Sequence, residues 1–469
     1  MGDGKIKEFI GEMQSFLKEE QVITDREGMS HFCYDATEIR FMPNVVLLPY
    51  TAEEVSCIMK IAYEMDLPIT PQGGRTGLSG GALPVKGGIV LSLLKMNRIL
   101  EIDRKNLQIV VEPGVIAADL QEALKGHNLF FPPDPSSTVE STLGGNVAEN
   151  AGYTRAVKYG VTRDYVLGLE AVLPDGEIIN VGGRTVKNVT GYDLVSLLVG
   201  SEGTLAVVTK IICKVLPKPA FRRTCISYLD DLGSAADLVV AIFEGGILPS
   251  AIECMDNTSI NCVADYLART ESLRREAAVL VLIEVDGTHQ GAVDAEAQRI
   301  LDLCNGMAGM IESRLAENDD QAEQLWRIRR ETLPALKAKG KDHLEADVVV
   351  PRYRLPFLMK AIKSAETGKT VKVATFGHAG DGNLHVTIQY RKRNFAELEE
   401  ANELLGEIYR KAVDMDGKLT GEHGVGITAK EYMKIQMTPG EIALMKRIKQ
   451  AFDPKGLLNP EKIFPDENE

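Results

Sequence analysis

The sequence predicts an α+β fold spread over more than one domain. Short runs of apolar and β-branched residues alternate along the chain with segments in which apolar residues recur at helical spacing. The chain has 469 residues, so at ~150 residues per domain about three domains are expected. Apolar residues make up 44% of the chain and charged residues 26%, a globular balance that excludes disorder, collagen and coiled coil.

The first half of the chain is predicted to open with an amphipathic helix, because apolar residues recur at helical spacing from Ile6 to Leu17. A strand at residues 44–48, a capped helix at 51–65 and a strand at 67–71 follow, which together make a short βαβ unit. Further elements are expected as strands at 89–93, 108–112, 167–173 and 204–215 and as a helix at 117–125.

The best candidate for a domain boundary is Leu216–Pro219, where two prolines end the preceding strand pattern and suit a linker. An α+β layer is expected beyond it. Its predicted helices are 234–243, 259–270, 291–305, 320–339 and 395–415, and its predicted strands are 278–285, 346–350 and 385–390. A last helix is predicted after it, at 439–452.

The charge and the cysteines restrict the class of partner and the compartment. Lys and Arg total 53 and Asp and Glu total 67, a formal net charge of −14, which disfavours nucleic acid or an anionic membrane as the main partner. The seven cysteines are scattered, with no pair at the two-residue gap that iron–sulfur and zinc sites favour. This usage fits a reducing compartment, so a cytoplasmic location is expected, without a secretion signal or a transmembrane segment.

A glycine-rich loop follows the βαβ unit, with five glycines in the nine residues 73–81. Its spacing fits neither an ordinary NAD-binding turn nor a P-loop. Small residues let several backbone N–H groups converge on a diphosphate, and Arg75 adds a charge. Glycines in turns often serve only to supply positive φ, so this loop alone identifies nothing. Two more small-residue tracts, at 131–152 and 199–204, favour one long, flat cofactor that lies against the backbone.

Two motifs supply possible metal ligands. His378 and His385 are seven residues apart among three glycines; on one helix they would be ~10.5 Å apart, too far for one ion, so the chain must fold back between them. Glu422 and His423 are adjacent and, if extended, point to opposite sides, so one can bind metal while the other faces substrate. His378, His385 and Glu422 make a set with open positions that suits Zn, Mn or Fe(II). The alternative is that these histidines only cap or hydrogen-bond within the core.

These motifs resemble the FAD-linked 2-hydroxy-acid dehydrogenases, which include D-lactate dehydrogenases, the FAD subunit of glycolate oxidase and D-2-hydroxyglutarate dehydrogenase. The resemblance runs from about Tyr34 to Phe464. It is carried by Pro71–Gly81, Pro132–Pro135, Arg155–Gly160, Lys187–Asn188, Gly191–Asp193 and Gly200–Thr204.

The resemblance implies four parts of the chain. A helical segment at 1–39 precedes a vanillyl-alcohol-oxidase (PCMH)-type FAD-binding domain at 40–219. An α+β substrate or cap domain with the metal motif occupies 220–417, and a segment at 418–469 carries the catalytic motif and returns to the FAD domain.

The same resemblance implies FAD with its diphosphate on the 73–81 loop and its flavin under the 133–152 stretch. No His or Cys occurs from 71 to 81, so FAD is expected to be noncovalent. Tyr153 stands where many relatives have a second glycine, so the resemblance does not predict the shape of the pocket beside the flavin. The implied FAD-binding residues are Gly73, Gly74, Arg75, Thr76, Gly77, Ser79, Gly80, Pro133, Asp134, Gly145, Asn146, Ala151, Gly152, Gly203, Val207, Val208 and Asn459.

For the chemistry, the resemblance implies His378, His385 and Glu422 as ligands of a divalent metal (Zn, Mn or Fe) and His423 as the catalytic base. The segment Trp326–Arg330 resembles one that supplies an arginine to the substrate carboxylate. By register Arg329 is preferred, although a solvated helix face would explain its neighbouring arginines equally well.

The implied reaction is metal-assisted oxidation of a D-2-hydroxy acid to the 2-oxo acid, with D-lactate first and glycolate or D-2-hydroxyglutarate as alternatives. The sequence has no cluster motif and no membrane segment, so FAD is expected to pass its electrons to a partner, an electron-transferring flavoprotein or an iron–sulfur subunit. Any association of the chain with a membrane is expected to occur through that partner. One alternative is a non-catalytic FAD electron-transfer subunit, against which the complete histidine set argues. Another is a metallohydrolase, which would leave the small-residue tracts without a role.

Overall fold

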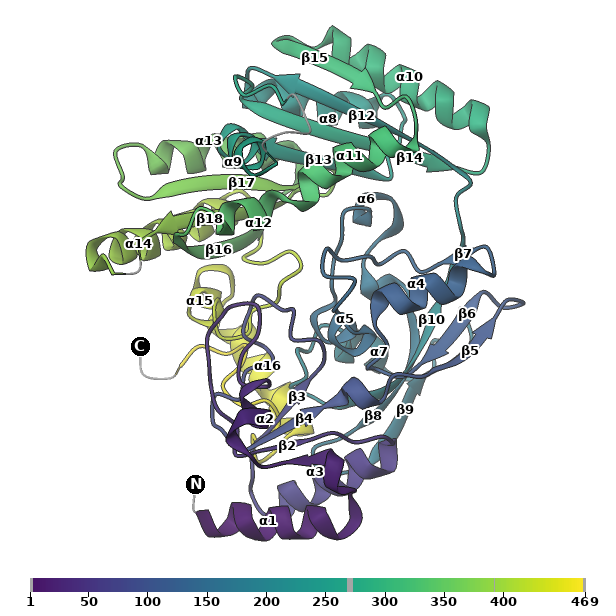
Figure 1. Cartoon of the computed structure of the whole chain (residues 1–469), viewed down its shortest axis with the longest axis vertical. Coiled ribbons are helices and arrows are strands. Elements are labelled where there is room, and N and C mark those ends of the chain that lie inside the picture. The colour runs from purple at the N-terminus through teal and green to yellow at the C-terminus, as the bar shows by residue number, and fades with distance from the viewer. Residues whose placement is uncertain (1–2, 268–272, 392, 467–469) are drawn as a thin grey trace. The chain divides into compact units, whose positions relative to one another are not determined.

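The computed structural model describes residues 3–267, 273–391 and 393–466 (Figure 1). By its internal contacts the chain forms two compact units. Unit 1 comprises residues 1–153, 161–218 and 422–469, and unit 2 comprises residues 154–160 and 219–421. Both units are therefore assembled from stretches that are separated in the sequence.

Unit 1 contains two main sheets. In the first, β4 lies between β2 and β3 and runs parallel to both, while β1 pairs antiparallel with β2. The second is antiparallel in the order β5-β6-β10-β8-β9. The strands of unit 1 are β1 (Val22–Ile23), β2 (Val45–Leu47), β3 (Ile69–Gln72), β4 (Ile89–Ser92), β5 (Ile99–Asp103), β6 (Gln108–Val111), β7 (Leu129–Phe130), β8 (Val166–Val172), β9 (Ile178–Gly182), β10 (Val207–Lys214) and β11 (Leu216–Pro217).

The predicted βαβ unit is confirmed, with β4 inserted between its two parallel strands. Thr51 caps its helix by accepting the amide of Glu54 at 3.2 Å, and the apolar face of that helix is buried. The helices of unit 1 are α1 (Asp3–Phe16), α2 (Arg26–Ser30), α3 (Ala52–Glu64), α4 (Ala117–Lys125), α5 (Leu143–Glu149), α7 (Leu194–Leu198), α15 (Met433–Gln436) and α16 (Pro439–Phe452).

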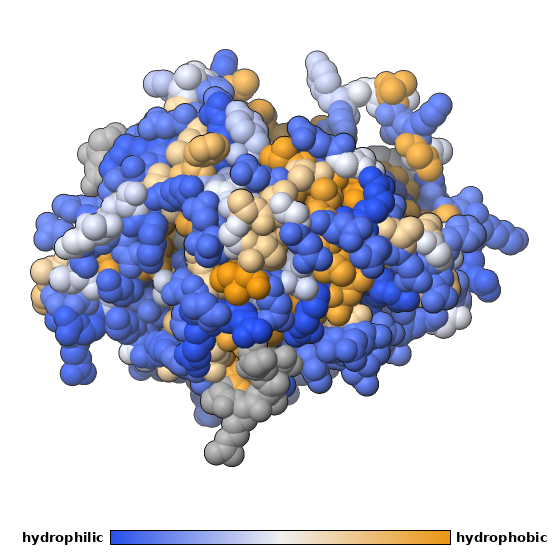
Figure 2. Space-filling view, turned by 90° about the horizontal axis from the view of Figure 1, so that it is seen from above, coloured by the Kyte–Doolittle hydropathy of each residue, from blue (hydrophilic) through white to orange (hydrophobic). Residues whose placement is uncertain are grey.

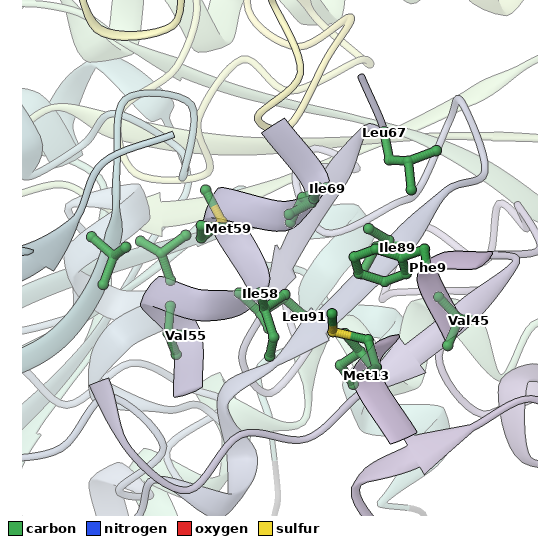
Figure 3. Packing of buried hydrophobic residues seen from close by; sticks show 14 of the residues in the cluster. Phe9, Met13, Val45, Val55, Ile58, Met59, Leu67, Ile69, Ile89 and Leu91 are labelled. Carbon is green, nitrogen blue, oxygen red and sulfur yellow. The ribbon is translucent and has the colours of Figure 1, made fainter. Parts of the chain in front are cut away.

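The core of unit 1 joins α1 and α3 to the parallel strands. Phe9 and Met13 of α1 meet Ile58 of α3 and Ile89 and Leu91 of β4 in one buried cluster (Figure 3). The predicted amphipathic N-terminal helix is thus part of this core.

Unit 2 is built on one antiparallel sheet of seven strands in the order β15-β12-β14-β13-β17-β18-β16. The chain enters it directly after β11, so the predicted linker region begins as a short strand that pairs with β7. The strands are β12 (Phe221–Leu229), β13 (Ala251–Asp256), β14 (Val279–Gly287), β15 (Met310–Leu315), β16 (Asp342–Val349), β17 (Lys372–His378) and β18 (Asn383–Tyr390).

Helices lie over both faces of this sheet, which explains why β14 is buried almost throughout. α8, α10, α13 and α14 pack together over one face, and α9, α11 and α12 pack over part of the other (Figure 1). The helices of unit 2 are α6 (Ala156–Tyr159), α8 (Leu232–Glu244), α9 (Asn257–Tyr266), α10 (Gln290–Gly306), α11 (Asp319–Arg330), α12 (Thr332–Lys337), α13 (Leu355–Glu366) and α14 (Phe395–Asp414).

One of two long helices predicted in unit 2 differs from the structure. The single helix expected at 320–339 is wrong: α11 ends at Arg330 and α12 begins at Thr332. Pro334 is the reason, because it has no N–H to donate and its ring clashes with the carbonyl four residues earlier. The helix expected at 259–270 is confirmed as α9, and its last predicted residues, 268–270, lie outside the described residues.

On the face shown in Figure 2, hydrophilic residues cover most of the surface and hydrophobic residues show between them in patches. Among the described residues, no helix combines the length and the apolar character needed to cross a membrane.

Phe9→Ala tests whether α1 belongs to the core. Phe9 is fully buried, so its truncation should lower the free energy of unfolding by about 3–5 kcal/mol, measured by urea denaturation. Phe16→Ala is the control on the same helix, because Phe16 is 40% exposed, and it should change that free energy by less than about 0.5 kcal/mol. Equal effects would mean that α1 does not pack as described.

Candidate active site

Within unit 1, Asn459 joins two of the predicted cofactor segments to strand β3. Its amide donates to the carbonyl of Ile69 at 2.7 Å, and its Nδ2 donates to the carbonyls of Gly81 at 2.9 Å and Glu202 at 2.8 Å. The start of β3, the 73–81 loop and the 200–204 loop are therefore held together by one residue of the C-terminal return.

The predicted cofactor segments carry buried polar atoms without a hydrogen-bond partner. Within the described residues, no hydrogen bond satisfies Arg75 Nη1, Ser79 Oγ, Thr138 Oγ1, Ser141 Oγ or Asn146 Nδ2. Buried polar atoms in folded proteins are nearly always paired, so a group of orphans in one region indicates a missing ligand. Hydroxyl, amide and guanidinium groups suit the many oxygen and nitrogen atoms of FAD, so these segments fit this cofactor.

Arg75 combines a strained backbone angle with a buried positive charge. Its φ of 58° lies in the left-handed region, which is costly for a residue with a side chain. Burial lowers the pKa of its guanidinium, which packs 4.9 Å over the ring of Phe32. A bound anion would offset the cost of burying this charge.

The other predicted FAD residues lie in or next to these loops. Gly145 and Asn146 form the start of α5, with Ala151 and Gly152 just after it. Gly152 faces Glu422, whose carboxylate would collide with a β-carbon at this position. For the remaining implied FAD residues, the structure gives the position but no contact that tests a role in FAD binding. They are Gly73, Gly74, Thr76, Gly77 and Gly80 in the loop after β3, buried Pro133 and half-buried Asp134 after β7, Gly203 beside Pro71, and Val208 on β10.

Val207 is different, because its side chain packs into the hydrophobic core of unit 1. Only its backbone remains available to a cofactor. Tyr153, where the sequence departs from many relatives, is buried in the same unit.

The loop with Glu422 and His423 is anchored by a carboxylate that no sequence motif assigned. Glu202 accepts the amides of Val425 at 2.8 Å and Gly426 at 2.7 Å. Burial raises the pKa of Glu202, and these two hydrogen bonds counteract that rise. Glu422 Oε1 lies 3.8 Å from His423 Nε2, so the two side chains do not diverge as an extended segment would make them.

Within unit 2, His378 and His385 are brought together by the predicted fold-back. β17 ends at His378 and β18 begins at Asn383, and the hairpin pairs Phe376 with His385. The two imidazole rings are 5.2 Å apart, edge to face. Gly382 makes the turn possible: its φ is 86°, and a β-carbon there would collide with the carbonyl oxygen of Val350.

Each imidazole has a buried carboxylate beside it. His378 Nδ1 lies 2.6 Å from Glu253 Oε1, and His385 Nδ1 lies 3.3 Å from Asp347 Oδ1. Metal-binding histidines commonly hold a carboxylate at the nitrogen that does not face the ion. Imidazole and carboxylate donors suit Zn, Mn or Fe, so these side chains fit a divalent metal.

Asp347 also binds the segment that leads to Glu422 and His423. Its Oδ2 accepts the Thr420 hydroxyl at 2.8 Å and the Gly421 amide at 2.9 Å, and Glu422 is the next residue in the chain. Asp347 itself could serve as a metal ligand with His385. No sequence signal identifies it, because it meets His385 only through the pairing of β16 with β18.

Arg329, the arginine preferred from the sequence, is the one buried arginine of its segment. Arg327 and Arg330 are exposed, and Arg330 forms an ion pair with Glu323. Arg329 Nε donates to Glu253 Oε2 at 2.6 Å, and the guanidinium lies 4.9 Å from the ring centre of Phe376. Burial would raise the pKa of Glu253, but the charges and hydrogen bonds of His378 and Arg329 outweigh it and lower that pKa.

Comparison with known proteins identifies the family. A model of the FAD binding domain matches residues 43–182, and the model "FAD linked oxidases, C-terminal domain" matches residues 218–463. The chain belongs to the FAD-linked oxidases.

This FAD-linked oxidase is 41% identical over 438 residues to glycolate oxidase subunit GlcD of Bacillus subtilis, covering 93% of the chain and 92% of the relative. It is 34% identical over 452 residues to D-lactate dehydrogenase of Anaerostipes hadrus, covering 94% of each. The solved structure of p-cresol methylhydroxylase matches with a TM-score of 0.80 at 18% identity, over 100% of this chain and 98% of that one. These comparisons confirm two predictions from the sequence, that the chain is an FAD-dependent oxidoreductase and that it has a PCMH-type α+β fold.

Gly77→Val tests the cofactor loop of this FAD-linked oxidase. A β-carbon on Gly77 meets no atom within 4 Å, so the fold should persist while the added bulk blocks the approach of the diphosphate. The variant should keep its unfolding temperature as apoprotein and lose most of its flavin, measured as the flavin-to-protein absorbance ratio. Gly126→Val is the control, because Gly126 at the end of α4 has the same free space outside the cofactor segments. Normal flavin content in Gly77→Val would refute the assignment.

Proposed function

We propose that this FAD-linked oxidase oxidises a D-2-hydroxy acid, D-lactate or glycolate in the first place, to its 2-oxo acid. The observation that carries the proposal is the group of side chains in unit 2: two buried imidazoles on one hairpin, each beside a carboxylate, with a buried arginine next to them. The names of the relatives, a glycolate oxidase subunit and a D-lactate dehydrogenase, support the same substrate class.

Arg329 binds the substrate carboxylate in this proposal. Its Nε is held by Glu253, and within the described residues no hydrogen bond reaches its two terminal amino groups. A guanidinium offers parallel N–H donors that match a carboxylate. The site thereby supplies positive charge to an anionic substrate, although the chain carries a net charge of −14.

His378, His385 and Glu422 would hold a divalent metal. When bound, the metal supplies a Lewis acid for the substrate hydroxyl, and FAD supplies the hydride acceptor. His423 takes the hydroxyl proton on a ring nitrogen as general base. Chain continuity supports the ligand set, because Gly421 binds Asp347 and is followed directly by Glu422.

A separate protein would take the electrons from FAD, either an electron-transferring flavoprotein or an iron–sulfur subunit. None of the seven cysteines is paired in a disulfide, and six are buried, which supports a reducing compartment such as the cytoplasm. No two of them stand at the two-residue gap that iron–sulfur sites favour. Co-purification from native expression should recover such a partner.

Anaerobic titration of the purified protein tests the substrate class. D-lactate or glycolate should bleach the flavin absorbance, whereas L-lactate should leave it oxidised. Including D-2-hydroxyglutarate shows how much side chain the pocket accepts. If none of these acids reduces the flavin, the chain is better described as a non-catalytic FAD electron-transfer subunit.

His423→Ala should reduce its flavin ~10²–10⁴ times more slowly at saturating substrate, because a positioned general base is lost. FAD and metal contents should stay at wild-type values, measured by absorbance and elemental analysis. His378→Ala should instead lose metal and turnover together and keep FAD, since the cofactor loops belong to unit 1. His31→Ala, at an exposed position, is the control. A wild-type rate of flavin reduction in His423→Ala would refute the base.

A further inference from the structure

Glu253 lies between the proposed metal ligand His378 and the proposed substrate arginine. It sits on β13 opposite His378 of β17, and no part of its side chain is exposed. Its Oε1 lies 2.6 Å from His378 Nδ1, and its Oε2 accepts from Arg329 Nε at 2.6 Å. Each carboxylate oxygen is therefore engaged by a different functional side chain.

A buried carboxylate is costly unless it is paired, so the presence of partners alone would indicate only stability. The identity of the partners is what distinguishes Glu253. A second carboxylate on the same face, Glu284 of β14, is equally buried and is bound by Arg155, Trp326 and Ser250. None of those three side chains belongs to the proposed chemistry, whereas both partners of Glu253 do.

We infer that Glu253 is a positioning residue that orients His378 for metal and Arg329 for substrate at the same time. It keeps the proton of His378 on Nδ1, which leaves the Nε2 lone pair for the metal. It binds the Nε edge of Arg329, which leaves the terminal amino groups for the acid. This inference rests on the proposed function.

The geometry makes glutamine an informative replacement. Glu253 accepts hydrogen bonds with both oxygens, whereas a glutamine of the same size accepts with one and donates with the other. If the amide oxygen faces Arg329, the amide N–H₂ faces His378 Nδ1 and moves the ring proton to Nε2, where it blocks the metal. If the amide is reversed, two donors meet at Arg329.

The experiment measures metal and substrate affinity on FAD-loaded protein stripped of metal with a chelator. Zn²⁺ and Mn²⁺ are added back in competition with a chelating dye. Glu253→Gln should bind both ions ~10–100 times more weakly, and the acid that bleaches the wild-type flavin should bind more weakly as well. FAD content should not change.

Glu284→Gln is the matched control, because it removes a charge of the same kind from the neighbouring strand. Both variants should lower the unfolding temperature, but only Glu253→Gln should lose metal affinity. If Glu253→Gln does not fold, the same affinities for metal and acid are measured on Glu253→Asp. Its shorter carboxylate can reach only one partner, so affinity for metal or for acid should fall.

The outcomes separate the inference from the proposed function. A wild-type protein that takes up neither ion refutes the proposed metal site, and the role of Glu253 with it. A wild-type protein that binds metal, together with Glu253 variants of unchanged metal and acid affinity, refutes the role of Glu253 alone. Equal loss of metal affinity in Glu284→Gln would reduce Glu253 to a structural residue.

Discussion

The register of the β17–β18 hairpin determines which side chains of unit 2 meet. It sets Phe376 opposite His385, and the neighbouring pairings set Glu253 opposite His378 and Asp347 opposite His385. Directly opposed residues share a face of the sheet, and a slip of one residue would turn a strand's side chains to the other face. Two imidazoles and two carboxylates from four strands thus come together through backbone pairing.

Because helices cover one face of the sheet and part of the other, the charges that are buried on it must be paired within the protein. Glu253 is engaged by His378 and Arg329, and Glu284 by Arg155. Breaking one side of such a pair leaves an uncompensated buried charge, which costs about 3–5 kcal/mol. The proposed substrate arginine is therefore kept in place by the same interactions that make its burial tolerable, and its side chain does not have to be ordered again when an acid binds.

The sequence predicts helices such as α1, α4 and α16 because their apolar periodicity is strong. It predicts only three of the seven strands in the sheet of unit 2, namely β14, β16 and β18. It predicts the fold-back between His378 and His385 because a helix cannot bring them to one ion, and it prefers Arg329 because of helical register. No sequence pattern assigns a role at the site to the carboxylates of Asp347, Glu253 and Glu202. Glu253 lies 125 residues before His378 in the sequence, and Glu202 lies 223 residues before Val425, beside Glu422 and His423. No local sequence pattern can therefore predict these contacts.

The break between α11 and α12 was not predicted either, although its cause is present in the sequence. Pro334 stands within the stretch expected as one helix, and its missing N–H ends the preceding helical ladder. The assignment of residues 154–160 to unit 2 had no such signal. It depends on Arg155, Lys158 and Tyr159 binding Glu284 and Asp286, more than 120 residues away.

The two units differ in how complete their polar groups are. In unit 2 the buried ions have protein partners, whereas the loops of unit 1 leave hydroxyl, amide and guanidinium atoms unsatisfied and hold Arg75 in a costly backbone conformation. Unsatisfied buried groups cost ~1–3 kcal/mol each, so the stability of unit 1 depends on its cofactor. A ligand that binds only the folded state stabilises it by RT ln(1 + [L]/Kd). FAD is therefore a structural component of unit 1 as well as its redox group, while the charged groups of unit 2 are already oriented before substrate arrives.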